Sequence, residues 1–117
     1  MNIPHLPPIR YAKKVVNRVD RSVEVLCEFD IAPTLGMMME AAAQGSSAFS
    51  DGKISVAFLA SAKDIRLLSS PKKTALLVSI ESLTSFSNIK EYKFAFFEED
   101  RKISEGIITL YIPHSTP

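Results

Sequence analysis

The segment Met37-Met38-Met39-Glu40-Ala41-Ala42-Ala43-Gln44 decides the fold of this chain, because it is the centre of its one convincing helical pattern. Pro33 and Thr34 offer a helix start, with Thr34 as the N-cap. Residues 37–49 supply helix formers, and Ser50-Asp51-Gly52 is expected to end the run. The sequence therefore predicts a central, largely apolar helix of about three to four turns.

Two polar residues interrupt this apolar helix. Glu40 and Gln44 lie four residues apart, so helical spacing places them on one face. A carboxylate costs free energy to bury unless it is exposed, paired or used. Glu40 is therefore either the acid or base of an active site or an ordinary surface residue of an amphipathic helix.

The rest of the chain has strand patterns, separated by short polar turns. Because these connections are too short for parallel crossovers, we expect antiparallel pairing. One helix with about six antiparallel strands is an α+β pattern, in which the sheet must curl around the helix to cover it. Such a sheet keeps an exposed edge, which favours dimerisation by edge pairing. The expected strands are 15–19, 22–29, 54–68, 74–86, 91–97 and 102–112.

Composition limits the class of protein. With 117 residues, 46% of them hydrophobic, we expect one domain over 1–117, with an extended lead-in at 1–9 and a tail at 113–117. A net charge of +1 gives no field that would favour nucleic acid or an anionic membrane. The single Cys27 and the lack of a signal segment predict a cytoplasmic protein, and no apolar run is long enough to span a membrane.

Three pieces of the sequence, in the same order, resemble the β-hydroxyacyl carrier-protein dehydratases of fatty-acid synthesis. Residues 8–19 are similar to the opening of those enzymes, and Glu40-Ala41-Ala42-Ala43-Gln44 is similar to their Glu-Ala-Met-Ala-Gln helix signature. Residues 58–63 and 67–71 resemble the strand and turn that follow. The resemblance implies the hotdog fold, a curled antiparallel sheet around a central helix, usually assembled as a dimer through a continuous sheet.

The resemblance also implies a tunnel for a phosphopantetheine-linked acyl chain, at which the helix glutamate works with a histidine from a loop of the other subunit. Glu40 matches that glutamate and Gln44 matches the glutamine of the signature. The loop is shortened here to Asp30-Ile31-Ala32, and the two histidines, His5 and His114, lie elsewhere. The glutamate therefore has a matching position, whereas its histidine partner has none.

Dehydration of a β-hydroxyacyl thioester needs a base for the α-proton, an acid for the leaving hydroxyl and a donor at the thioester oxygen. The backbone N–H groups of Leu35, Gly36 and Met37 are candidate donors, because a helix N-terminus carries unpaired N–H groups and positive potential. Glu40 is the candidate acid. Gln44 would contact the substrate or orient Glu40.

The candidate bases are Asp30, His5 and a water molecule. Hydrolysis of a thioester needs less, because one carboxylate can activate water or attack the carbonyl carbon. Hotdog thioesterases carry that carboxylate either in the loop before the central helix or on the helix itself. Asp30 and Glu40 are similar to them in occupying these two positions. A third reading is a non-catalytic acyl-binding or regulatory dimer that has lost the catalytic loop.

The expected partner is an acyl thioester carried by acyl carrier protein or coenzyme A, bound by a homodimer or a larger assembly of dimers. Lys72 and Lys73, with Lys63 and Arg66, either meet that carrier or form a solvated surface. We expect no metal and no cofactor, because neither histidine has metal-ligand spacing and nothing resembles a phosphate loop or a nucleotide fold.

Overall fold

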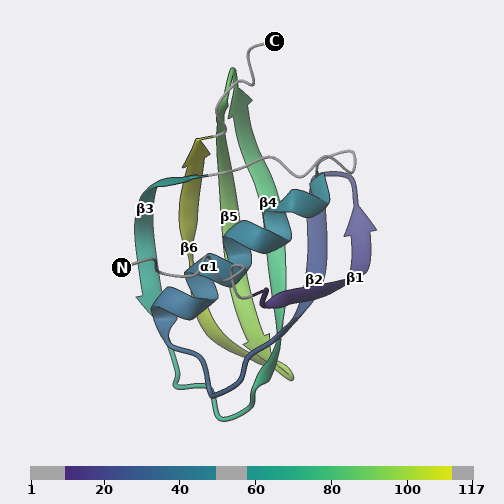
Figure 1. Ribbon diagram of the computed structural model, residues 1–117, viewed down its shortest axis with the longest axis vertical. Coiled ribbons are helices and arrows are strands. Elements are labelled where there is room, and N and C mark those ends of the chain that lie inside the picture. The colour runs from purple at the N-terminus through teal and green to yellow at the C-terminus, as the bar shows by residue number, and fades with distance from the viewer. Residues whose placement is uncertain (1–9, 50–57, 112–117) are drawn as a thin grey trace, which may run out of the picture.

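In the computed structural model, which describes residues 10–49 and 58–111, a six-stranded antiparallel sheet curls around one α-helix. The strands follow the order β1-β2-β4-β5-β6-β3, so β1 and β3 form the two edges. Figure 1 shows α1 lying obliquely across the concave side of the sheet. The predicted α+β architecture is confirmed. The elements are β1 Ala12–Val19, β2 Ser22–Glu28, α1 Leu35–Gly45, the 3₁₀ helix η1 Ser46–Phe49, β3 Phe58–Leu67, β4 Ala75–Phe86, β5 Ile89–Glu98 and β6 Arg101–Tyr111.

The core lies between α1 and the concave face of the sheet. Alternate residues of the central strands point inward, and each buried aliphatic or aromatic side chain contributes about 1.5–3 kcal/mol. Leu26, an apolar residue at an outward position of β2, lies on the convex face and is paired in register with Leu77. The inward set includes Val23, Val25, Cys27, Leu76, Val78, Ile80, Tyr92, Phe94 and Phe96, which pack with Met38, Ala41 and Ala42 of α1.

The helix begins where the sequence predicts and ends earlier. Thr34 is the N-cap, because its Oγ1 accepts the Met37 N–H at 3.2 Å. The α-helix ends at Gly45, and residues 46–49 continue as a 3₁₀ turn in which the Ser46 hydroxyl donates to the Ala43 carbonyl. Gly45 lies tightly against the sheet, since a Cβ there would be 2.8 Å from Ile80 Cδ1. The expected stop at 50–52 lies outside the described residues.

The carboxylate of Glu98 fastens the β3–β4 connection to the end of β5. Its Oε2 accepts the backbone N–H groups of Lys72 at 2.7 Å and Lys73 at 2.8 Å, and its Oε1 accepts from Arg101 Nη2 at 2.8 Å. The N–H groups of Lys73 and Lys72, followed by Arg101, hold the pKa of Glu98 below its usual value. Lys72 and Lys73 thus hold this turn in place through their backbone amides.

Acidification is expected to release this connection. Because folding lowers the pKa of Glu98, its stabilisation is present above the unfolded pKa of about 4.3 and is lost as the pH falls through the folded value. Glu98→Gln should therefore flatten the dependence of unfolding free energy on acidic pH and speed hydrogen exchange at the Lys72 and Lys73 amides. Glu99→Gln is the matched control, because Glu99 is exposed and pairs only with the Lys73 ammonium among the described contacts. Equal exchange in both variants would contradict this role for Glu98.

Candidate functional site

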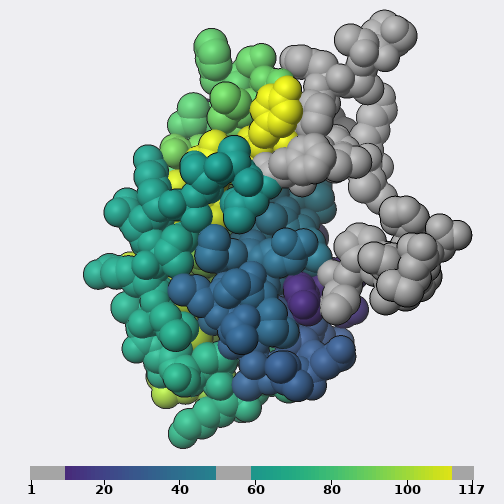
Figure 2. All heavy atoms as spheres, turned by 60° about the vertical axis from the view of Figure 1, so that its left-hand side comes forward, coloured from purple at the N-terminus to yellow at the C-terminus, as the bar shows by residue number. Residues whose placement is uncertain are grey.

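Glu40 lies on the side of α1 that faces away from the sheet. The buried residues Met38, Ala41, Ala42 and Gly45 form the sheet-facing side, and helical geometry puts Glu40 opposite them, where it is exposed. Figure 2 shows this side of the helix open and beside β3. None of the five ion pairs among the described residues includes Glu40. Its carboxylate is therefore accessible to a ligand or a second chain.

Gln44 has a different environment from Glu40, although both belong to the same helical stripe. Its Oε1 accepts the backbone N–H of Tyr11 at 2.7 Å and of Ala12 at 3.2 Å. The side chain thus joins the start of β1 to α1 and satisfies two donors of the edge strand. Sequence reasoning missed this role, because no local pattern reports a partner 33 residues away.

The N-terminus of α1 offers fewer free donors than the sequence predicts. The Thr34 hydroxyl accepts the Met37 N–H, and Met37 Sδ in turn accepts the Thr34 N–H at 3.5 Å. These contacts leave the N–H groups of Leu35 and Gly36 as the candidates for a thioester oxygen. Gly36 is exposed, and a Cβ there would meet nothing closer than Thr34 Oγ1 at 3.9 Å, so a ligand can approach this backbone.

Asp30 lies in the connection between β2 and α1, at the edge of a small hollow. This hollow has a volume of about 160 Å³. The rings of Tyr11 and Phe29, with centroids 4.9 Å apart, form an apolar part of it. Charged groups of both signs surround these rings, and sequence reasoning missed the two basic ones. The lining residues are Arg10, Tyr11, Lys13, Glu28, Phe29 and Asp30; Glu40 is not one of them.

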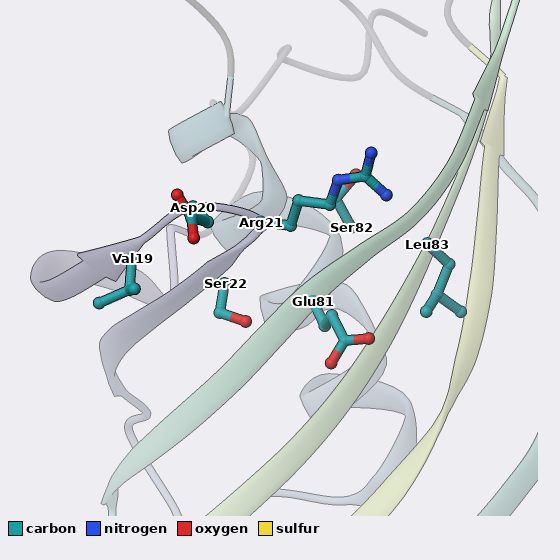
Figure 3. Close-up of a pocket in the computed structure, with 7 residues that line it drawn as sticks. All are labelled: Val19, Asp20, Arg21, Ser22, Glu81, Ser82 and Leu83. Atoms are coloured by element: carbon teal, nitrogen blue, oxygen red, sulfur yellow. The ribbon is translucent and has the colours of Figure 1, made fainter.

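A wider depression of about 720 Å³ lies at the other end of β1, where the β1–β2 turn meets β4. Figure 3 shows that the Arg21 guanidinium and the Asp20 carboxylate extend in opposite directions there. None of its lining residues was predicted to belong to the site. They are Val19, Asp20, Arg21, Ser22, Glu81, Ser82 and Leu83.

The remaining candidate groups are one cysteine and two histidines. Burial raises the pKa of the Cys27 thiol to about 12, so this cysteine is a poor nucleophile. His5 and His114 are outside the described residues. Within residues 10–49 and 58–111, no three His, Cys, Asp or Glu side chains gather as metal ligands. No helix in the same ranges is long and apolar enough to cross a membrane.

No protein-family model and no curated protein sequence matches the chain. Solved structures do match. The dehydratase heterocomplex ApeI:P from Xenorhabdus doucetiae has a TM-score of 0.74 at 13% identity, over 97% of this chain and 89% of that one. The protein smu.793 from Streptococcus mutans, bound to acetyl CoA, has a TM-score of 0.66 at 18% identity, over 94% and 97%. A Q32A mutant of the thioesterase SAV0944 from Staphylococcus aureus has a TM-score of 0.64 at 12% identity, over 86% and 93%.

At such low identity these likenesses show the fold and not the activity. The one helix, the six-stranded curled antiparallel sheet and its edges at β1 and β3 are those of a hotdog fold. The fold implied by the resemblance to the dehydratases is therefore confirmed.

Proposed function

We propose that this protein binds acyl thioesters at the outer side of α1 and acts on them as a dehydratase or hydratase. The observation that carries the proposal is the exposed carboxylate of Glu40, which lies one helical turn after the exposed Gly36 at the N-terminus of α1. An acid placed near N–H donors suits a reaction in which charge develops on a thioester oxygen. The solved neighbours support the ligand class, since one is a dehydratase complex and another is bound to acetyl CoA.

In the proposed dehydration, the Leu35 and Gly36 amides stabilise the enolate oxygen that forms when a base removes the α-proton. Glu40 then donates its proton to the β-hydroxyl, the C–O bond breaks, and water leaves as the C=C bond forms. Asp30, His5 and a water molecule are the candidate bases; Asp30 is the one of the two side chains that belongs to the described residues. Hydration is the same sequence in reverse.

We further propose a cytoplasmic homodimer formed along β3. This edge strand pairs with β6 on one side only, and Leu59, Leu67 and Leu68 are about half exposed at or just beyond it. Pairing two β3 strands would continue the sheet and cover these side chains. Because α1 is open on the β3 side (Figure 2), the same pairing would bring the two helices closer and enclose Glu40.

A thioesterase is the second candidate function. Its supporting observation is the hollow that Asp30 lines, because a carboxylate beside an apolar surface could activate water against a bound thioester. A solved neighbour is a thioesterase. The third candidate, a non-catalytic acyl-binding module, is favoured by the short connection at 30–32, which carries no histidine.

The test uses β-hydroxyacyl and saturated acyl thioesters of pantetheine, with enoyl formation and thiol release as readouts and calorimetry for binding. Enoyl formation from the first substrate would support the dehydratase, whereas thiol release from the second would support the thioesterase. Binding without turnover would identify the non-catalytic module. Neither binding nor turnover with any chain length would overturn the proposed function.

A further inference from the structure

The basic side chains are distributed unevenly over the chain. Residues 10–21 contain five of its 14 basic side chains and one of its 13 acidic ones. All five are exposed, and the strand that carries most of them, β1, is an edge of the sheet. The near-neutral net charge of the whole protein therefore hides a positive edge. Its basic residues are Arg10, Lys13, Lys14, Arg18 and Arg21.

Acidic partners neutralise basic side chains elsewhere and leave this edge charged. All five ion pairs of the described residues belong to side chains outside it: those of Lys63, Arg66, Lys73, Arg101 and Lys102. On the positive edge, Arg18 donates to the Ala48 carbonyl at 2.8 Å and lies over the Phe49 ring, which fixes the side chain without cancelling its charge. A positive edge that takes part in none of the ion pairs among the described residues attracts an anionic partner over distances up to the Debye length.

The positive edge also has apolar side chains and a fixed position relative to the candidate site. Val15, Val16 and Val19 are about half exposed between its charges. At one end, Arg10 and Lys13 line the hollow that holds Asp30. At the other end, Arg21 lies in the wider depression shown in Figure 3. Charged and apolar groups thus alternate along an edge that begins at a candidate catalytic carboxylate.

We propose that the positive edge is a docking surface for an acidic carrier protein that delivers the acyl thioester. This inference rests on the proposed function and adds the identity of the carrier. The strand spans roughly 25 Å, too long for the clustered phosphates of one coenzyme to reach all of its charges. A protein surface with acidic and apolar residues can contact its whole length, with charge complementarity setting the encounter rate.

The proposal is tested with Lys14→Gln/Arg21→Gln, which removes two charges outside the Asp30 hollow. The control, Lys93→Gln/Lys102→Gln, removes the same charge from exposed positions away from the edge. Binding of an acidic acyl carrier protein loaded with a β-hydroxyacyl chain is compared with binding of the same chain on coenzyme A. We expect the edge variant to weaken carrier binding about tenfold or more and to reduce its salt dependence, with coenzyme A binding unchanged and the control near wild type.

Each alternative outcome has a definite meaning. Carrier binding at wild-type strength by both variants would overturn the docking surface. A loss of the same size in both variants would overturn it as well. Binding of the coenzyme A thioester but not of the loaded carrier would overturn it while leaving the proposed function intact. Binding of neither thioester would remove both the proposed function and the inference that rests on it.

Discussion

Replacing Glu40 with glutamine is expected to lower turnover of β-hydroxyacyl thioesters by about 100-fold or more, the usual contribution of a positioned acid or base. Glutamine keeps the shape and hydrogen-bonding capacity of the side chain but cannot donate its proton to the leaving hydroxyl. Because Glu40 is exposed and makes none of the described ion pairs, the free energy of unfolding should change by no more than about 0.5 kcal/mol. Steady-state kinetics and urea unfolding of the same preparation measure both quantities.

Asp30→Asn and Glu28→Gln separate the proposed mechanisms. Both carboxylates line the same hollow, but only Asp30 is a candidate base or nucleophile. If Asp30 is the base, Asp30→Asn should lower turnover strongly and Glu28→Gln should not. If hydrolysis through Asp30 is the activity, thiol release should fall with Asp30→Asn and persist with Glu40→Gln. Wild-type turnover in both Glu40→Gln and Asp30→Asn would contradict the site assignment.

Replacing Gly106 with valine is expected to destabilise the protein by about 3 kcal/mol, at the upper end of the usual cost of overpacking a core. Gly106 is buried on the inward face of β6, next to Ile65 of β3. A Cβ there would overlap Ile65 Cδ1 and lie 3.2 Å from both Ile65 Cα and Phe94 Cε2. The strand preference of valine, at most about 1 kcal/mol, would not offset the overlap with Ile65 Cδ1 and the tight approach to Ile65 Cα. The midpoint of urea unfolding measures the effect.

Two variants control for this interpretation. Gly36→Ala also removes a glycine but meets only Thr34 Oγ1 at 3.9 Å, so it should be neutral or should stabilise by up to about 1 kcal/mol. Ile65→Ala removes most of the side chain that Gly106→Val would strike, so the double variant Gly106→Val/Ile65→Ala should cost less than the sum of the two single changes. Strict additivity would show that the contact with Ile65 is not the source of the strain.

Much of this fold could be predicted from local patterns. Val23, Val25 and Cys27 alternate in the sequence with Glu24, Leu26 and Glu28, which is the period of a half-buried strand, and these three residues are buried in β2. Thr34 was predicted as the N-cap and is the N-cap. The predicted end of α1 lies several residues beyond the observed end at Gly45. The sequence around Gly45 does not reveal its close contact with the sheet at Ile80. Of the predicted site groups, Glu40 is on an accessible face, whereas the amide of Met37, one of the predicted donors, is bound by the Thr34 hydroxyl.

The sequence by itself determined the order of the elements and the placement of Glu40 and Gln44 on one face of the helix, because side-chain periodicity reports which residues share a face. Only the tertiary structure decided that Gln44 binds the backbone of β1, that Glu98 binds the turn at Lys72 and Lys73, and that basic side chains line a sheet edge. The contacts of the Gln44 carboxamide and of the Glu98 carboxylate join residues that are 25 or more positions apart in the sequence. Such contacts depend on the strand order and curl of the sheet, which bring distant segments together and which no local pattern encodes.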